Sequence, residues 1–334
     1  MAGLISYGTY VPYFRLDKKT IATAMGAGGG KGTRAVASYD EDTTSMGVEA
    51  ARNALAALPG AKAHALVFST TDPAYLDKTN ATAIHAALDL SQEAFAVDAM
   101  GSVRSGVGAL MLGASCGRPT LVVLSDRRTG QPTSGDEANG GDAAVALLFG
   151  TDGVVAELVA QASSTAEFLD RWRAPGSSSS QLWEERFGET VYVPLAQAAI
   201  TDACKQSGIT AETIDHLVVT GPHTRSVGVI ATPTPMPTTP QTPNTATSST
   251  TTKDGLTQQK LSATVSCGKR SLWLGVEVMT GRFGFARESR RPHQRLGQPR
   301  SFKTGASSGR ERLRRVNSID GLQTSPARRQ SRFG

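Results

Sequence analysis

The sequence predicts an α/β fold built on a largely parallel β-sheet with helices on both faces. Residues 1–160 alternate short apolar segments with longer segments in which apolar residues recur at helical spacing. Continuous apolar strands alternating with helices are typical of a parallel sheet whose two faces are both covered. The expected strands lie, in chain order, in residues 3–13, 64–71, 94–99, 119–126 and 142–150.

The helices of this first part carry their own start signals. Residues 40–58 place Met46 and Ala50 at helical spacing, and they open with acidic residues and threonines suited to a helix start. Residues 80–90 follow the same helical pattern, with Asn80 as the expected N-cap. We therefore expect two amphipathic helices that each cross back over the sheet.

The pattern restarts after a loop or lid that contains the Ser-rich residues 174–180. Residues 191–209 predict a helix, and residues 215–223 predict a strand that ends in a turn. One face of the predicted helix carries Leu195, Ala199 and Ala203. A second α/β unit thus begins here, and its pattern stops near residue 230.

The remainder of the chain has a different composition. Residues 231–252 are uncharged and dominated by Thr and Pro, so they have too little apolar surface to offset the entropy of ordering. Residues 271–279 form one apolar island, expected to be a lone strand, and we expect most of the tail to be disordered. The predicted organisation is a first half at 1–165, the start of a second half at 166–230, and a tail at 231–334.

Charge divides the chain in the same way. The formal net charge is +6, but residues 253–334 hold 18 Lys and Arg against 5 Asp and Glu, which gives +13. Residues 1–252 hold 17 against 24, which gives −7. Basic clusters at 287–295 and 310–315 resemble segments that bind phosphate backbones non-specifically. They have few interleaved aromatics and no nucleic-acid-binding module, which favours a solvated tail and leaves nucleic-acid association as an alternative.

Cysteine usage and apolar runs exclude several classes of protein. The three cysteines, Cys116, Cys204 and Cys267, form no C-x-x-C pair and are too scattered for a disulfide framework, so no metal site is expected. The N-terminal residues lack the pattern of a secretory signal. No apolar run approaches the roughly 20 residues of a membrane span. These features predict a cytoplasmic protein without membrane association.

The segment 94–115 is the candidate active-site turn, because a strand here breaks at Met100–Gly101 and leads into a helix. It offers Ser102 and Ser105, and no cysteine nearer than Cys116. A serine nucleophile needs a base within hydrogen-bond reach, and the spacing of a hydrolase nucleophile elbow is absent. Capping of the following helix is the favoured role of Ser102, and a nucleophilic role is the alternative.

Four passages of the first half resemble the thiolase superfamily, nearest to condensing enzymes similar to hydroxymethylglutaryl-CoA synthase and 3-ketoacyl-acyl-carrier-protein synthase III. No single passage is diagnostic, and the resemblance rests on their order and spacing. A further passage at 182–223 looks like the opening of the family's second half. The four passages are residues 3–16, 39–55, 69–90 and 140–150.

The resemblance implies a five-layer αβαβα fold of two similar halves, normally a homodimer. Enzymes of this family transfer an acyl group from CoA to a cysteine at a helix N-terminus and then condense it with a second thioester. The resemblance places Val103 at the position of that cysteine, with Ser102 beside it, and His223 near the family's catalytic histidine. Because valine has no nucleophilic atom, catalysis is expected to be impaired or absent.

Three functions follow for the chain. The first is a condensing-enzyme homologue that uses an acyl-CoA thioester as substrate and has no permanently bound cofactor. The second is a non-catalytic acyl-CoA-binding or partner subunit, since some relatives work with an OB-fold protein. The third is the nucleic-acid association through the basic tail.

Overall fold

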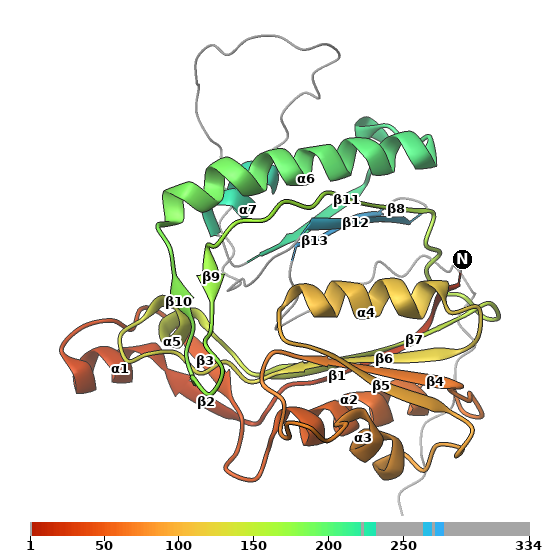
Figure 1. The fold of residues 1–334 in the computed structure, drawn as a ribbon, viewed down its shortest axis with the longest axis horizontal. Helices are drawn as coiled ribbons and strands as arrows, with labels where there is room; N and C mark the ends of the chain where they lie inside the picture. The colour runs from red at the N-terminus through yellow and green to blue at the C-terminus, as the bar shows by residue number, and fades with distance from the viewer. Residues whose placement is uncertain (1, 222–223, 232–262, 269–270, 277–334) are drawn as a thin grey trace, which may run out of the picture. The chain divides into compact units, whose positions relative to one another are not determined.

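The computed structural model describes residues 2–221, 224–231, 263–268 and 271–276. The elements in these ranges belong to one compact unit, Met1–Phe283. Helices and sheets alternate in five layers: two helices, a five-stranded sheet, one central helix, a four-stranded sheet and two further helices (Figure 1). This is the αβαβα layering that the family resemblance implies.

The first sheet has the strand order β1-β7-β6-β4-β5. β6 pairs in parallel with β4, and β4 pairs in parallel with β5, whereas β7 is antiparallel to both β1 and β6. Four of the five strands therefore run in one direction, as a largely parallel sheet predicts, and the sheet is mixed because β7 alone runs in the opposite direction. The strands are β1 (Gly3–Tyr10), β4 (Ala65–Thr70), β5 (Phe95–Met100), β6 (Thr120–Asp126) and β7 (Ala143–Gly150).

The connection between β6 and β7 explains the mixed polarity. Parallel neighbours need a crossover connection, usually through a helix that spans the sheet. Residues 127–142 contain only the five-residue helix α5 (Gly135–Asn139) and stay at one edge of the sheet. The chain therefore turns back, and β7 runs antiparallel to β6.

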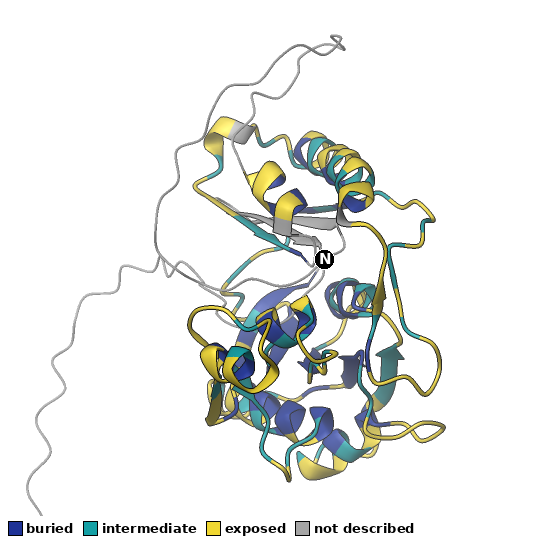
Figure 2. Cartoon of the chain, turned by 90° about the vertical axis from the view of Figure 1, so that its left-hand side faces the viewer, coloured by how far each residue is buried: buried dark blue, intermediate teal, exposed yellow. Residues whose placement is uncertain are grey.

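Two helices cover one face of this sheet and one helix covers the other. α2 (Thr43–Ala56) packs on β1, β6 and β7, and α3 (Ala81–Ala87) packs on β4 and β5. On the opposite face α4 (Arg104–Ser115) contacts β4, β5, β6 and β7. Figure 2 shows buried residues concentrated on the strands and on the helix faces turned toward them. The largest buried side chains of this core are Met46, Leu66, Phe68, Ile84, Leu121 and Leu148.

The start of α2 follows the prediction from its sequence. Asp42 accepts a hydrogen bond from the backbone N–H of Ser45, and Ser45 Oγ accepts one from the backbone N–H of Asp42. This reciprocal capping box satisfies two N–H groups that a helix otherwise leaves unpaired at its start. α2 then lies so close to β1 that a Cβ atom at Gly8 would stand 2.2 Å from the backbone nitrogen of Ala54.

The second sheet has the strand order β11-β13-β12-β8. β13 (Ser271–Val276) pairs in parallel with β11 and antiparallel with β12, so the strand predicted to stand alone is paired on both sides. The other three strands are β8 (Ala160–Ser163), β11 (His216–Thr220) and β12 (Ala263–Gly268). The remaining residues of the predicted disordered tail lie outside the described residues.

Two helices pack on this second sheet. α6 (Glu185–Ser207) contacts β8, β12 and β13, and α7 (Thr224–Ala231) contacts β11 and α6. α6 begins six residues before the predicted start. Its predicted apolar face is turned to the core through Ala199 and Ala203, with Leu195 half-buried. None of the described helices is long and apolar enough to cross a lipid bilayer.

The remaining short elements lie outside the two large sheets. Near the N-terminus, β2 (Phe14–Asp17) pairs with β3 (Thr33–Val36), and α1 (Lys18–Met25) lies between them in the chain. The Ser-rich loop at 174–180 connects β9 (Arg171–Trp172) with its antiparallel partner β10 (Gln181–Leu182). A 3-10 turn, η1 (Ala211–Thr213), precedes β11.

Candidate functional site

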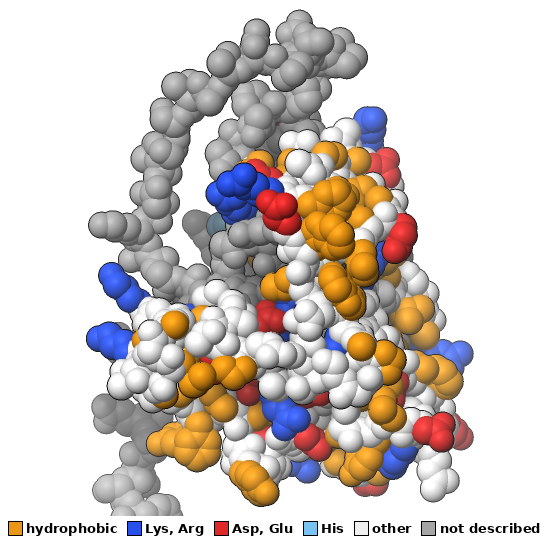
Figure 3. Space-filling model, turned by 60° about the vertical axis from the view of Figure 1, so that its left-hand side comes forward, with side chains coloured by type: hydrophobic (Ala, Val, Ile, Leu, Met, Phe, Trp, Pro, Cys, Tyr) orange, Lys and Arg blue, Asp and Glu red, His pale blue; other side chains and the backbone are white. Residues whose placement is uncertain are grey.

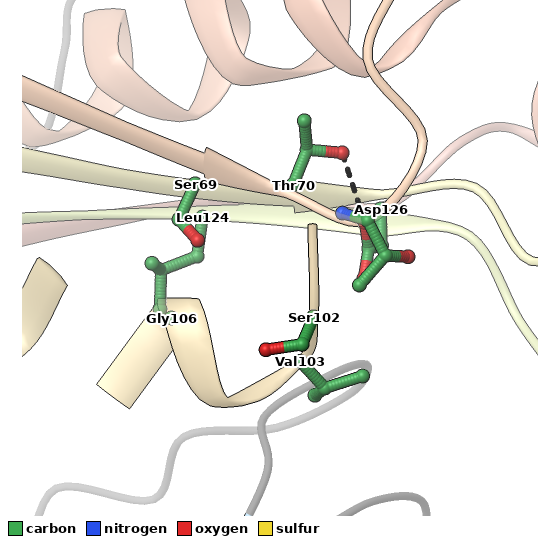
Figure 4. Close-up of a pocket in the computed structure, with 8 residues that line it drawn as sticks. Ser69, Thr70, Ser102, Val103, Gly106, Leu124 and Asp126 are labelled. Carbon is green, nitrogen blue, oxygen red and sulfur yellow. Dashed lines mark hydrogen bonds between the residues drawn. The ribbon is translucent and has the colours of Figure 1, made fainter. Parts of the chain in front are cut away.

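A pocket lies where the carboxyl ends of the parallel strands β4 and β6 meet the start of α4 (Figure 4). Ligands of α/β proteins commonly bind at this edge of a sheet, because loops and helix N-termini converge there. The pocket encloses about 210 Å³ of space, part of it open to solvent. Its lining residues are Ser69, Thr70, Thr71, Ser102, Val103, Gly106, Leu124 and Asp126.

The turn between β5 and α4 brings two of the predicted residues to this pocket. Gly101 has a φ of +110°, a left-handed conformation that glycine adopts without steric cost. Val103 follows at the helix start with its side chain buried, at 8% exposure. The buried group at the position predicted for a nucleophile is therefore an isopropyl group.

The prediction that Ser102 caps α4 was wrong. The capping position belongs to Val103, and no side chain caps the helix, because the chain enters α4 one residue later than expected. Ser105 instead closes the turn: its Oγ donates to the Met100 carbonyl oxygen at 3.1 Å and accepts from the Ser102 backbone N–H at 3.4 Å. Ser102 itself is exposed, with its Oγ 3.5 Å from Ser105 Oγ.

Asp126 is the buried acid of the pocket, and the sequence analysis did not single it out. Its Oδ1 accepts hydrogen bonds from Thr70 Oγ1 at 2.9 Å and from the Thr71 backbone N–H at 2.6 Å. Burial raises the pKa of this carboxyl above its ordinary value, while Arg128 and the two threonine donors act in the opposite direction. The signal available in the sequence was an acid at the carboxyl end of a continuous apolar strand.

Polar contacts fix the segment that follows β4 beside the pocket. Asp72 forms an ion pair with Arg127, with 3.3 Å between Oδ2 and Nε. Thr43 Oγ1 donates to the Asp72 carbonyl oxygen at 2.7 Å, and Arg173 donates to the carbonyl oxygen of Thr71. The end of β4 is thus attached to α2, to the loop after β6 and to the β9 segment.

The loop between β6 and β7 is fixed by a buried ion pair. Arg34 Nη2 and Asp142 Oδ1 are 3.4 Å apart, and both side chains are less than a tenth exposed. Asp142 also accepts from the backbone N–H groups of Arg128 and Ala37, and Arg34 donates to the Arg128 and Glu137 carbonyl oxygens. These hydrogen bonds compensate both buried charges, which would otherwise be costly to desolvate.

Asn80 occupies the predicted N-cap position of α3, but its side chain does not cap the helix. Its backbone is already helical, and its side chain forms no capping hydrogen bond to α3. The carboxamide instead exchanges two hydrogen bonds with the backbone of Tyr75, each 3.0 Å long, and donates to Asp98 at 3.1 Å. Asp98, on β5, accepts a hydrogen bond from the backbone N–H of Ala81 at 2.7 Å, so the carboxylate of Asp98 caps α3.

Neither Cys116 nor Cys204 lines the pocket. Cys116 is exposed and follows the last turn of α4, a helix of twelve residues and about 18 Å, so it lies at the opposite end from Val103. Cys204 is buried on α6, and burial raises the pKa of its thiol. Within the described ranges no three His, Cys, Asp or Glu side chains gather as a metal site. His223 lies outside the described residues.

The chain is similar to hydroxymethylglutaryl-CoA synthases of archaea. It is 26% identical to the enzyme of Picrophilus torridus over 237 residues, which are 67% of this chain and 68% of that protein. It is 30% identical to the enzyme of Pyrobaculum aerophilum over 204 residues, 57% of this chain and 58% of that protein. The chain spans between 58 and 69% of the length of the synthases it matches. No protein-family model matches it.

Solved structures share the fold. A 3-oxoacyl-acyl-carrier-protein synthase III from Pseudomonas aeruginosa superimposes with a TM-score of 0.59 at 21% identity, over 69% of this chain and 78% of that one. A hydroxymethylglutaryl-CoA synthase complexed with CoA gives a TM-score of 0.56 at 16% identity, over 65% and 59%. A third structure, with a TM-score of 0.55, 19% identity, and coverage of 65% and 59%, is MvaS in complex with 3-hydroxy-3-methylglutaryl coenzyme A.

Proposed function

We infer the function of this chain from its family: over about two thirds of its length it belongs to the thiolase-like superfamily of condensing enzymes, among those similar to hydroxymethylglutaryl-CoA synthase and 3-oxoacyl-acyl-carrier-protein synthase III. We propose that it binds an acyl-CoA thioester at the pocket beside α4 without forming an acyl-enzyme there. The observation that carries the proposal is Val103, which lines the pocket at the strand-to-helix turn with a buried, unreactive side chain.

A CoA thioester is the ligand that the relatives support best. Two of the structures with this fold contain CoA or 3-hydroxy-3-methylglutaryl coenzyme A. The pocket of this chain is too small for a whole CoA, so we propose that only the acyl end of such a ligand is placed at its mouth. The pantetheine and nucleotide parts would then lie outside the pocket.

Ser102 does not supply the missing nucleophile. A serine hydroxyl attacks a thioester only when a neighbouring base removes its proton. Ser102 Oγ has the Ser105 hydroxyl as its hydrogen-bond neighbour, and within the described part of the chain no histidine or carboxylate contacts it. The proposed function is therefore ligand binding by a chain that has the fold of a condensing enzyme.

The test is intact-mass spectrometry of the full chain after incubation with acetyl-CoA. We expect the wild-type chain to gain no acetyl group, and the Val103→Cys variant to gain one, because the substitution restores a thiol at a helix N-terminus, where the thiolate is favoured. Cys116→Ser in both backgrounds serves as the matched control, since Cys116 is exposed at the other end of α4.

Peptide mapping of any adduct decides between the outcomes. An acetyl group on Ser102 of the wild-type chain would overturn the proposal, because it would show catalysis by the neighbouring residue. Failure of the wild-type chain to bind CoA or acetyl-CoA in calorimetry would overturn it as well. The homodimer and the OB-fold partner predicted from the resemblance remain proposals, to be tested by light scattering and by co-purification.

A further inference from the structure

Ser69 is the polar side chain of the pocket that the contacts described above do not use. It lies next to the end of β4, is 4% exposed and lines the pocket. Among the described residues its hydroxyl forms no hydrogen bond, whereas neighbouring Thr70 and Asp126 are hydrogen-bonded to each other. A hydroxyl that faces a pocket and is not used by other groups of the protein is a candidate for binding a ligand atom.

The surroundings of Ser69 show where its hydroxyl points. A Cβ atom built on Gly106 would stand 3.9 Å from Ser69 Oγ, so the hydroxyl faces the first turn of α4 at a position with no side chain. Figure 4 shows Ser69 on the sheet side of the pocket and Ser102 at the start of the helix. The start of α4 has no side-chain cap, and the N-terminal end of a helix carries a partial positive charge.

We propose that Ser69 donates a hydrogen bond to the acyl carbonyl oxygen of a CoA thioester bound at the start of α4, and that it thereby makes the protein distinguish acyl-CoA from free CoA. This inference rests on the proposed function, and it adds a positioning residue that acts without covalent chemistry. The uncapped end of α4 favours the partial negative charge of the same oxygen.

A neutral carbonyl oxygen suits this pocket better than a carboxylate. Asp126 lines the same pocket, and an ionised Asp126 would repel a second negative charge. A thioester carbonyl accepts a hydrogen bond from a serine hydroxyl without adding a charge. Acetyl-CoA is the probe of choice, because acetyl is among the smallest acyl groups and the position facing Ser69 on α4 is a glycine.

The experiment measures dissociation constants of the full chain for acetyl-CoA and for free CoA by isothermal titration calorimetry. We expect the wild-type chain to bind acetyl-CoA more tightly than CoA. Ser69→Ala is expected to weaken acetyl-CoA binding about fivefold, the effect of one neutral hydrogen bond, and to leave CoA binding unchanged. Ser125→Ala is the matched control, because Ser125 Oγ is buried, has no hydrogen-bond partner among the described residues and does not line the pocket.

A second variant, on α4, tests the same space next to the Ser69 hydroxyl. Gly106→Ala adds a methyl group 3.9 Å from Ser69 Oγ and 3.8 Å from Leu124 Cδ2, ordinary contact distances, so the fold accommodates it. The methyl group occupies the space in front of the Ser69 hydroxyl. We expect this variant to lose the preference for acetyl-CoA in the same way as Ser69→Ala.

The outcomes separate this inference from the proposed function. If the wild-type chain binds both ligands and neither variant changes its preference, Ser69 has no role in acyl recognition, while the proposed function stands. If the wild-type chain binds neither ligand, the proposed function fails and this inference fails with it. If Ser125→Ala has the same effect as Ser69→Ala, the effect is not specific to the pocket and the inference is overturned.

Discussion

The two sheets of the molecule have the same kind of helix cover but different cores. The first sheet is packed with large side chains, including Phe68, Met46 and Leu121, each fully buried. The core described for the second sheet consists largely of alanines from α6 and β8, together with Val227 and Ile230 from α7. Because hydrophobic stabilisation scales with buried apolar area, each alanine of the described second core contributes less than a large side chain of the first core.

The surface around the start of α6 does not add to this contrast. Several large hydrophobic side chains are exposed there, among them Trp183 at 58% and Phe187 at 44%. Hydrophobic side chains lie among charged ones on the face drawn in Figure 3. The first region exposes aromatic side chains as well, with Tyr13 at 88% and Phe95 at 63%, so the two regions differ in their described cores and not in their surfaces.

The largest effect is expected from removing a core side chain of the first sheet. Phe68→Ala should lower the free energy of unfolding by about 3–5 kcal/mol, because it leaves a large cavity in the middle of β4. Val227→Ala, at the corresponding depth of the second core, should lower it by only about 1.5 kcal/mol, the value of two methyl groups. Urea denaturation followed by circular dichroism measures both; equal losses would contradict the contrast between the cores.

Glycines of the two regions provide the second comparison. Gly8→Ala should destabilise the protein by about 1–3 kcal/mol, since its Cβ would overlap the backbone of α2 at Ala50 and Ala54. Gly228→Ala in α7 should instead stabilise it by up to about 1 kcal/mol, because open space surrounds that position and alanine favours the helix. Thermal unfolding of the two variants should shift in opposite directions, and a shift of the same sign would show that one helix is placed differently.

The smallest effect concerns the pH dependence contributed by Asp126. Its pKa is raised by burial, so the folded state holds the proton more tightly than the unfolded state, whose pKa is near 3.8. The associated stability is fully present below that value and is lost as the pH rises through the folded pKa. Asp126→Asn keeps the acceptor for Thr70 and Thr71 without the charge, so it should be more stable than wild type at neutral pH.

Urea unfolding of this variant and of wild type at pH 5 and pH 8 checks the prediction. The difference in the free energy of unfolding between the variant and wild type should be at least as large at pH 8 as at pH 5. A variant that is less stable than wild type at pH 8 would show that Arg128 overcompensates the buried charge. Asp72→Asn is a useful control, because Asp72 is only partly buried in its ion pair with Arg127.

Much of the fold was predictable because burial leaves a direct pattern in sequence. The continuous apolar runs at 64–71, 119–126 and 142–150 are β4, β6 and β7. The direction of β7 was not predictable in the same way, because strand polarity depends on the path of the connection and not on the strand's own residues. The pairing of residues 271–276 was not predictable either, because their parallel partner strand, β11, is distant in sequence.

The candidate site was predicted in position but not in composition. The break at Gly101 located the turn, since a strand that runs into a helix is visible in the pattern. Ser102 was assigned to capping, yet a shift of one residue gives that position to Val103. Asp126 and Ser69 were missed because their significance lies in burial and in the lack of a partner, which only the packed structure reveals.

The pairing of β1 with β7 has a consequence for the order of events during synthesis. Gly3 pairs with Gly150, and at the other end of the ladder Tyr10 pairs with Ala144, so β1 cannot form this pairing until residues 143–150 have left the ribosome. Contacts so distant in sequence form slowly, because a long loop must close before they repay its entropy. Until then the chain exposes an unpaired strand, and the nascent first half depends on late residues to complete its sheet.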